Sequence, residues 1–583
     1  MSDSAQLADQ FLLQSSLKAD TSNHVSRGKS VATVDDGQSG SYSSGIVSFD
    51  CAAALNGSQG YASLKDAYIT LPFVVSMKNT AATALDAGAA PTRYALGLKC
   101  NVATVIDEVK VYLNGKSIIT PSEYKQFWSN VRAMAELTTA EVEKHGADML
   151  LYPDDWESIK HSVSAAVSGD GYSNNSLAGN SSLVLSSGEP VRSNTGFLRR
   201  VLNNPPEVAG SANSYGWPSL NTSTSQAIAQ MRGTGAFKKG SALTQGSTLG
   251  EWFYMLKIRL VDLHPIFAEI DLVANPQLKL ELKVQTGYCD LTLTPSATAT
   301  SRTMRLDSTT LVAGSICPVM IAGSHGAAAD AMNDVIGTSG KSDKLRVAWG
   351  PIHNSITTIA TSGNYFPFTQ ARLNLPFYDI ANPTTLVSKP MKTIKYLDCY
   401  SQMVEDAAGI GLMTNNKTFS IQIASSHKNV KYVAVIPFAN TKSGNYASAT
   451  VPQYASPFDS APWTCQPGLS IRDFQVQVGN KNVFQDVHSY DWMTFMDEFS
   501  KIGAVNGDLS REISNGLIGF DKWQTAQRIL VADCSRISDP NVPQSIKVSG
   551  TNVATQGTNF LVLVVYERSL ELDRITGEVY RAD

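Results

Sequence analysis

The sequence predicts an all-β protein built from antiparallel sandwiches, and three features lead to that expectation. Short segments that alternate apolar and polar side chains recur along most of the chain, as in strands with one buried and one solvated face. Turn-forming residues, among them 42 Gly and 24 Pro, separate these segments. After residue 340 the strand-like segments follow one another without long amphipathic helices, which favours sandwiches over alternating strand–helix units.

Size and charge limit the possible classes of protein. The 583 residues exceed the size at which one hydrophobic core stops growing, so we expect at least two domains. The net charge of −4 gives no basic footprint, so direct sequence-specific binding of nucleic acid is not expected. The N-terminus lacks a signal-peptide pattern, and the longest apolar run, residues 560–566, is far shorter than a membrane span. We expect a soluble intracellular product, and membrane contact is left open.

The cysteines favour the same compartment. They are odd in number, scattered, and never in C-x-x-C spacing: Cys51, Cys100, Cys289, Cys317, Cys399, Cys465 and Cys534. Buried reduced thiols in a reducing compartment explain this pattern better than a disulfide framework.

Several segments of the first half have distinct compositions. Residues 1–59 are expected to form an arm, with a possible short helix over 7–17 followed by a Ser/Gly/Asp-rich stretch. The pair Asn114-Gly115 follows an alternating segment and predicts a tight hairpin, because such a turn needs positive φ at both positions. Helices are expected near 122–134 and 139–150, and long exposed loops over 162–248.

The segment 253–287 predicts a strand, a two-turn helix and a second strand. The apolar residues of the helix fall on one stripe, formed by Leu263, Ile266, Phe267 and Ile270. Asp262 is placed to cap its N-terminus, and Pro265 is tolerated in its first turn. His264 stands beside Asp262, but side chains two residues apart on a helix do not face each other. We therefore expect His264 to cap or pack rather than to act as a base, and the helix to close one end of a sheet.

The chain contains a weak internal repeat. Segments 108–128 and 473–493 each combine a hairpin with a Tyr and several large apolar residues. The spacing from Asn to Tyr is the same in both, from Asn114 to Tyr124 and from Asn480 to Tyr490. This similarity predicts two related β domains.

Motifs that would carry chemistry are incomplete. Residues 337–343, GTSGKSD, end like a phosphate-binding loop, but Val335 stands where the earlier Gly is required and a strand follows. Residues 231–235, MRGTG, fit the M-x-G-x-G pattern cut by adenovirus-like maturation proteases, yet a loop is the simpler interpretation. The carboxylates at 154–155 and at 141 and 143 are most simply solvated.

No catalytic constellation emerges from the other motifs. The sequence has no G-x-S-x-G elbow, and its eight His stand in no metal-ligand spacing. We predict no catalytic, cofactor-binding or metal-binding residues, no cofactor and no enzymatic activity.

Strand-like segments of both halves resemble a known family. In the second half they are residues 392–404, 432–439, 474–484, 528–537, 544–552 and 559–579; in the first half they are residues 65–73, 111–118 and 258–271. Together they resemble the double jelly-roll major capsid proteins of the adenovirus-like lineage, especially the virophage and Polinton-like virus branch. The likeness covers most of residues 60–583, but neither the arm nor the 162–248 loops.

The resemblance implies two fused eight-stranded antiparallel jelly-roll sandwiches with short helices in the connecting loops. The implied division is an arm over 1–59, a first roll over 60–385 and a second roll over 386–583. The first roll would carry a long loop insertion at about 120–250, and the long loops of this roll would form an outward tower. The arm would tie neighbouring capsomers together from inside.

The implied function is that of a major capsid protein of a dsDNA virus. Three chains would form a trimeric, pseudo-hexameric capsomer that tiles an icosahedral virion shell, assembled inside the host cell. The implied partners are the homotrimer, neighbouring capsomers, and penton and minor capsid proteins. Two alternatives stay open: a non-enzymatic β-sandwich carbohydrate-binding or adhesion protein, and a β-rich hydrolase.

Overall fold

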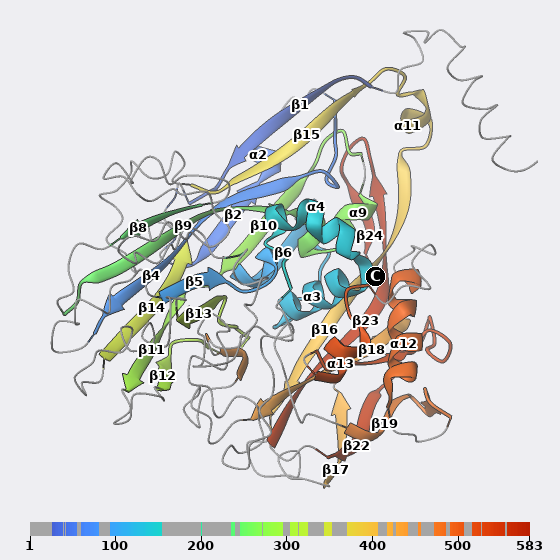
Figure 1. The fold of residues 1–583 in the computed structure, drawn as a ribbon. Coiled ribbons are helices and arrows are strands. Elements are labelled where there is room, and N and C mark those ends of the chain that lie inside the picture. The colour runs from blue at the N-terminus through green and yellow to red at the C-terminus, as the bar shows by residue number, and fades with distance from the viewer. Residues whose placement is uncertain are drawn as a thin grey trace, which may run out of the picture.

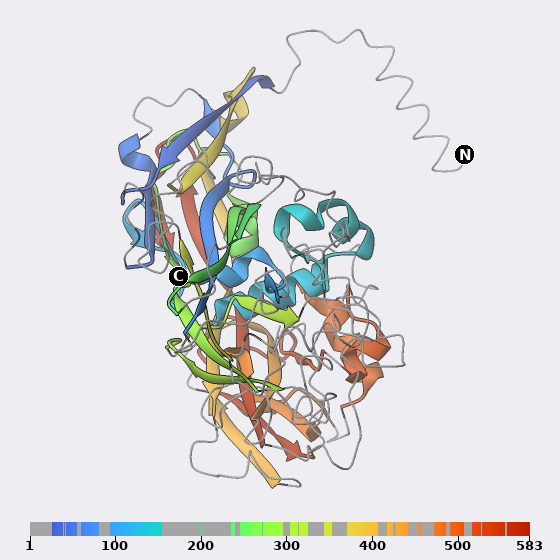
Figure 2. The same ribbon diagram turned by 60° about the vertical axis from the view of Figure 1, so that its left-hand side comes forward.

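Two antiparallel β-sandwiches lie side by side in the computed structural model of the chain (Figures 1 and 2). The structure describes residues 26–54, 60–80, 94–153, 200, 235–239, 245–294, 303–323, 343–351, 370–405, 417–440, 453–457, 471–485, 490–505, 516–553 and 557–582, apart from gaps at 39, 41, 43, 271, 313, 424–426, 456 and 526. The predicted helix over 7–17 and most of 162–248 lie outside these residues.

Eight strands form the first sandwich. They are β1 (Ser26–Asp35), β2 (Ile46–Asp50), β4 (Tyr68–Asn79), β6 (Ile106–Leu113), β7 (Lys116–Ser117), β9 (Thr248–Arg259), β10 (Leu278–Val284) and β15 (Arg372–Ile380). One sheet runs β1–β15–β4–β9 and the other β2–β10–β6–β7. Counted along the chain, these sheets hold strands in the orders 1-8-3-6 and 2-7-4-5, which is the strand order of a jelly roll.

The second sandwich repeats this order. Its strands are β16 (Met391–Val404), β17 (Lys417–Ile423), β18 (Val430–Asn440), β19 (Ile471–Val478), β20 (Lys481–Asn482), β21 (Leu530–Asp533), β22 (Ile546–Asn552) and β23 (Gly557–Asp573). They pair as β16–β23–β18–β21 and β17–β22–β19–β20, and β24 (Val579–Ala582) adds to β23. The predicted fold of two fused jelly rolls is therefore confirmed by the connectivity of the chain itself.

Additional strands widen the first roll, mostly between β10 and β15. They are β3 (Tyr61–Ala62), β5 (Tyr94–Leu98), β8 (Gly235–Lys239), β11 (Gly287–Thr294), β12 (Thr303–Thr309), β13 (Val319–Gly323) and β14 (Asp343–Pro351). Strand β4 pairs with β15 over residues 68–70 and with β14 over residues 73–79. The first roll thus has a larger sheet than the second.

The internal repeat corresponds to one position in both rolls. In each, the hairpin is followed by a helix: α3 (Lys125–Glu136) after β6–β7 and α12 (Trp492–Val505) after β19–β20. The first turn has φ of 47° at Asn114 and 74° at Gly115, as the hairpin prediction requires. The second turn is Gly479-Asn480, so Gly479 rather than Asn480 occupies the position of Asn114. The structural correspondence is therefore shifted by one residue from the predicted repeat.

The predicted two-turn helix is wrong in one respect, because it is broken into two single turns, α8 (Leu260–Leu263) and α9 (Ile266–Glu269). A residue before proline is driven out of the helical region, and His264, before Pro265, has φ of −154° and ψ of 137°. Asp262 is therefore not an N-cap but lies inside α8, where its carboxylate binds Arg259 at 2.7 Å. The predicted apolar stripe is confirmed as buried.

Two strands lie inside the segment predicted as an arm. Strand β1 pairs with β15 and strand β2 pairs with β10, so residues 26–50 contribute to the first roll. Residues 26–31 are exposed on both faces of their ribbon. An alternating pattern of apolar residues is absent there, and that pattern is what a strand prediction requires.

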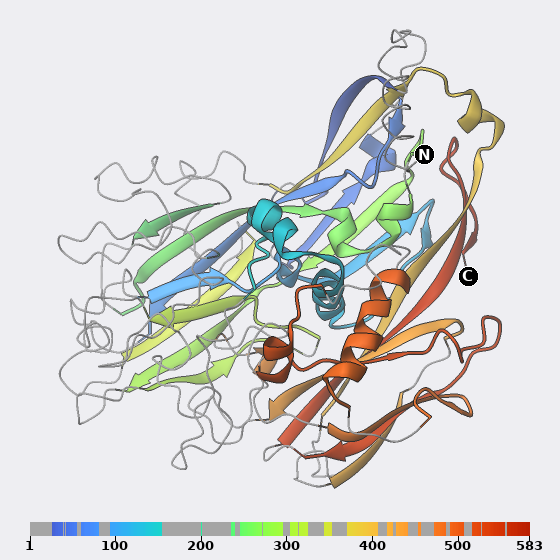
Figure 3. The same ribbon diagram turned by 45° about the vertical axis from the view of Figure 1, so that its right-hand side comes forward.

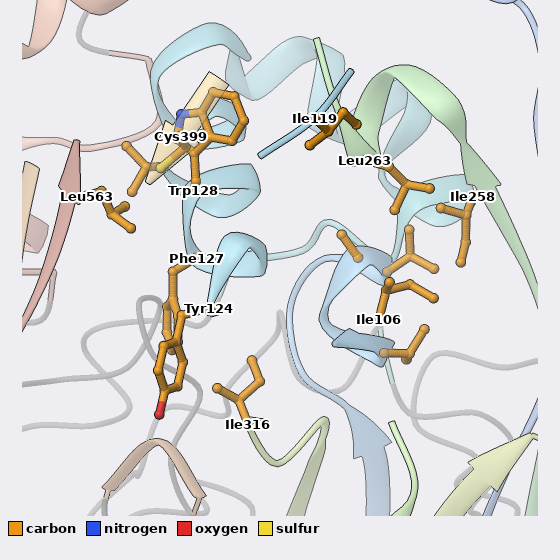
Figure 4. Close-up of a cluster of buried hydrophobic side chains, with 14 of the residues drawn as sticks. Ile106, Ile119, Tyr124, Phe127, Trp128, Ile258, Leu263, Ile316, Cys399 and Leu563 are labelled. Carbon is orange, nitrogen blue, oxygen red and sulfur yellow. The ribbon is translucent and has the colours of Figure 1, made fainter. Parts of the chain in front are cut away.

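The hydrophobic core runs through both rolls. Figure 4 shows side chains of α3, including Phe127 and Trp128, between residues of the first roll and residues of the second, among them Cys399 and Leu563. Helix α3 lies next to α12 at the place where the two rolls meet (Figure 3). The six described cysteines are all buried and unpaired by disulfides.

Replacing Phe267 by Ala tests the role of α9. Phe267 has no exposed surface, so we expect the change to lower the free energy of unfolding by about 3 to 5 kcal/mol. The exposed neighbour Glu269 provides the control, since Glu269→Ala should change that free energy by less than about 0.5 kcal/mol. Chemical denaturation of both variants is the measurement, and equal stability of the two would contradict the packing described.

Candidate functional site at the junction of the two rolls

Helix α3 of the first roll inserts aromatic side chains into the second roll. The ring of Phe127 lies 5.4 Å from that of Phe438 in an edge-to-face arrangement. The indole N–H of Trp128 donates to the hydroxyl of Tyr432 at 3.1 Å. These contacts combine apolar burial with a specific hydrogen bond, so they fix where the helix sits on the second roll.

A buried carboxylate forms the polar centre of the junction. Asp398 lies on β16 and has no exposed surface. Its oxygens accept hydrogen bonds from the backbone N–H of Thr120 at 2.8 Å and from the ammonium of Lys125 at 2.9 Å. His264 Nε2 lies 3.3 Å away and the guanidinium of Arg568 3.4 Å away. Three of these four partners belong to the first roll.

The carboxylate of Asp398 is ionised. Its burial alone would raise its pKa, but the charge of Lys125 and then the hydrogen bond from His264 hold the pKa well below its usual range. Arg568 adds a second positive charge from β23. A buried charge is tolerated only when it is paired and hydrogen-bonded. The pairing residues come from both rolls, so the site is complete only when the rolls are together.

His264 serves this junction from the break between α8 and α9. Its Nδ1 accepts the backbone N–H of Ile266 at 3.2 Å, which caps α9, so the proton of the neutral ring sits on Nε2 and is donated to Asp398. Burial lowers the pKa of His264 to about 4. The ring also lies edge-on to Trp128, 5.5 Å between centroids. The predicted capping and packing role is confirmed.

The segment after β7 is held by side chains of the second roll. Tyr396 donates its hydroxyl proton to the carbonyl of Ile118 at 2.6 Å, and Arg568 donates to the same carbonyl at 3.1 Å. The hydroxyl groups of Thr120 and Tyr566 lie 2.5 Å apart. Residues 118–120 are thus fixed by β16 and β23, and this fixes the chain leading into α3.

Both ring nitrogens of His264 are engaged in hydrogen bonds and the ring is 1% exposed, so the junction holds this ring in one position. Within the part of the chain that the structure describes, no group of three or more His, Cys, Asp or Glu side chains could hold a metal ion.

The remaining motifs lie mostly outside the described residues. Of residues 337–343 only Asp343 is described, and it begins β14; of residues 231–235 only Gly235 is described, and it begins β8. Asp154 and Asp155 are also outside. Glu141 closes a capping box with Thr138 at the start of α4 (Thr139–Met149). No helix among the described residues is both long and apolar enough to cross a bilayer.

A cleft of about 950 Å³ runs between the rolls near this junction. Its lining carries charges of both signs that pair with one another, as Arg259 does with Asp262 at 2.7 Å and Lys395 with Glu567 at 3.8 Å. Charges that are already paired offer little attraction to a charged ligand.

The strand order defines a class, that of chains containing two jelly rolls in tandem. No protein-family profile and no curated protein matches the sequence. Among solved structures, the chain is similar to the cryo-EM structure of the Sputnik virophage, with 11% identity, a TM-score of 0.47, and 96% of this chain and 89% of that chain covered. It is also similar to the mavirus major capsid protein, with 11% identity, a TM-score of 0.40 and coverage of 98% and 92%. A third such structure is the Faustovirus major capsid protein, with 8% identity, a TM-score of 0.40 and coverage of 95% and 92%.

Replacing Asp398 by Asn tests the junction. The change removes the negative charge that the buried Lys125 and the partly buried Arg568 share, so we expect the free energy of unfolding to fall by about 3 kcal/mol. Asp290→Asn removes the more exposed pair of Asp290 with Arg346 and should cost less than about 1 kcal/mol. Denaturation at one protein concentration compares the two, and a cost for Asp398→Asn no larger than that of the control would contradict the assigned role.

The pKa of His264 predicts a dependence of stability on pH. Because this pKa is about 4 in the folded chain and 6.5 as the ordinary value, only the unfolded chain gains the proton between these two values. Folding stability due to His264 is therefore present above pH 6.5 and is lost towards pH 4, by about 3 kcal/mol. Asp398 keeps its charge throughout this window, since its pKa lies well below 3.8.

The variant His264→Gln isolates this effect. We expect the stability difference between the natural chain and the variant to be largest above pH 6.5 and to shrink as the pH approaches 4. Denaturation at a series of pH values measures the difference for both proteins in the same buffers. A difference that stays constant with pH would show that the pKa of His264 is the same in the folded and the unfolded chain.

Proposed function

We propose that the chain is a viral major capsid protein and that three copies form a pseudo-hexameric capsomer of an icosahedral shell. The observation that carries the proposal is the repetition of one strand order in two adjacent rolls. Three such chains around a three-fold axis supply six similar rolls. The trimer can therefore occupy a position in the shell that has six neighbouring capsomers. Many modest contacts of this kind close a shell without any single strong interface.

The junction supports this proposal in physical terms. A pseudo-hexagonal outline requires the two rolls of a chain to keep one fixed relation, because a free hinge would let the six units vary in position. The ionised Asp398, which binds Thr120, Lys125 and His264 of the other roll, resists such movement. Separating the rolls would expose this charge network and the aromatic face of α3.

The division into domains remains part of the proposal. The boundary between 385 and 386 falls in the helix α11 (Thr384–Ser388), between the last strand of the first roll and the first strand of the second. With β1 and β2 included in the first roll, the arm that would tie neighbouring capsomers shortens to residues 1–25. Assembly with other capsid subunits in the virion, including penton and minor capsid proteins, follows from the same role.

The native mass of the purified chain tests the proposal. We expect light scattering to give three times 62.6 kDa, and negative-stain images of the same peak to show hexagonal outlines. Asp290→Asn should leave the trimer unchanged, whereas Asp398→Asn should reduce the yield of trimer because the relative position of the two rolls is then less strictly fixed. A monodisperse monomer that never assembles would contradict the proposal and favour the carbohydrate-binding alternative, which binding of the monomer to a glycan array would then test.

A further inference from the structure

Strand β1 is an outer strand with an open edge. It lies along the rim of the sheet beside β15 (Figure 1). Its ladder with β15 runs regularly from Gly28, opposite Asp379, to Asp35, opposite Arg372. Among the strands that the structure describes, β15 is the only one that pairs with β1. An open edge of this length is a template for another strand.

A proline fixes which backbone groups of β1 face outward. Pro376 lies opposite Val31 and has no N–H, and its carbonyl accepts the N–H of Ser63 on the other side of β15. The N–H and C=O of one residue point to the same side of an antiparallel strand. Val31 therefore makes no ladder bond with β15, and its own N–H and C=O point to the open edge. The same alternation applies to Lys29 and Thr33.

The side chains of this edge are unusually free of cover. Val31 is 52% exposed, one of few large apolar side chains on the surface described. Natural edge strands are blunted by shortening, by charged side chains such as Lys, by proline or by bulges, and Lys29 is the one such cation in residues 28–35. Residues 28–35 contain no proline and keep a regular ladder.

We infer that β1 pairs with β1 of a second copy of this chain, antiparallel and around a two-fold axis that passes through Val31. Each Val31 N–H then donates to the carbonyl of Val31 in the other copy. The pairing would join two rolls through one continuous sheet. It goes beyond the proposed capsomer, because a two-fold contact cannot lie within a three-fold ring and must link chains of different trimers.

The chemistry of the strand favours its own copy as the partner. Centred on Val31, the pairing sets Lys29 opposite Thr33 and brings Arg27 near the Asp35–Arg372 ion pair of the other copy, so no like charges stand directly opposite each other. A centre at Lys29 would place two ammonium groups opposite each other, which destabilises a strand pair. A centre at Val31 also packs the two exposed valine side chains together on one face.

The variant Val31→Pro separates edge pairing from folding. Proline is tolerated on an edge strand where the N–H faces solvent, so the ladder with β15 and the native trimer should be retained. Two outward hydrogen bonds per contact are lost, so the dissociation constant between trimers should rise about tenfold or more. Sedimentation velocity over a concentration series measures this constant, and the melting temperature monitors folding.

Ala32→Pro is the matched control for the direction of the backbone groups. Ala32 lies opposite Leu375 and directs its N–H to β15, so proline there should remove a ladder bond and lower the melting temperature. If Val31→Pro lowers the melting temperature as much as Ala32→Pro, the assigned direction of the edge groups is wrong and the inference fails with it.

Cross-linking at Val31 tests the contact directly, whatever the effect of proline. Val31→Cys should give a disulfide-linked pair of chains under mild oxidation, since the two residues would be directly opposite. The six described native cysteines are buried and do not compete, and the unsubstituted chain controls for the seventh. Thr33→Cys should cross-link poorly, because the two Thr33 positions would be about 13 Å apart along the strands.

The outcomes distinguish this inference from the proposed function. Trimers that associate, and whose Val31→Cys variant cross-links chains of different trimers, support both. Trimers whose association is unchanged by Val31→Pro, with no cross-link at Val31, overturn the two-fold pairing and leave the capsomer standing. A chain that forms only cross-linkable dimers supports the pairing and contradicts the trimer. Cross-linking at Thr33 as efficient as at Val31 overturns the register.

Discussion

The ionised carboxylate of Asp398, closed off from solvent, is the constraint on which the arrangement of the two rolls depends. A single buried charge is costly, and here it is compensated only by donors that reach it from both halves of the chain. The surrounding aromatic contacts of α3 would tolerate small shifts, whereas the hydrogen bonds would not. Apolar burial holds the two rolls together but is not directional. The hydrogen bonds to Asp398 are directional, so they select one relative position of the rolls.

The helices α3 and α12 occupy corresponding positions in the two rolls but make different contacts. In both rolls a helix follows the short hairpin of the fifth strand, and α3 and α12 lie beside each other. In the first roll this helix has become the contact with the second, through Phe127, Trp128 and Lys125. A fused pair thus needs no separate linker domain, because an element common to both rolls forms the connection.

Local patterns in the sequence predict local structure well and distant polar contacts poorly. The Asn114-Gly115 turn and the buried stripe around Phe267 follow from spacing alone. The restriction on the residue before proline predicts the break at Pro265, whereas the apolar stripe alone predicts one continuous helix. Residues 26–31 of strand β1 lack alternation because water reaches both faces of the strand there.

The centre of the junction could not be predicted in this way. Apart from the backbone N–H of the adjacent Cys399, the partners of Asp398 stand between 134 and 278 residues away in sequence, so no spacing relates them. The available signal was an Asp in the middle of the apolar run YLDCY on a strand, which indicates a buried charge in need of a partner. The identity of that partner depends on the packing of two domains.

The pairing of β1 with β15 has a consequence for synthesis of the protein. Asp35 forms its ion pair with Arg372, 337 residues later, so the first strand of the roll must wait for the last strand of the same roll. At ribosomal rates this delay is roughly 20 to 70 seconds. During that time β1 lacks its partner strand β15, while other copies of the chain are being synthesised on the same mRNA. Timely binding by a chaperone, or slow initiation that spaces the ribosomes, would protect the first roll from pairing with the wrong copy.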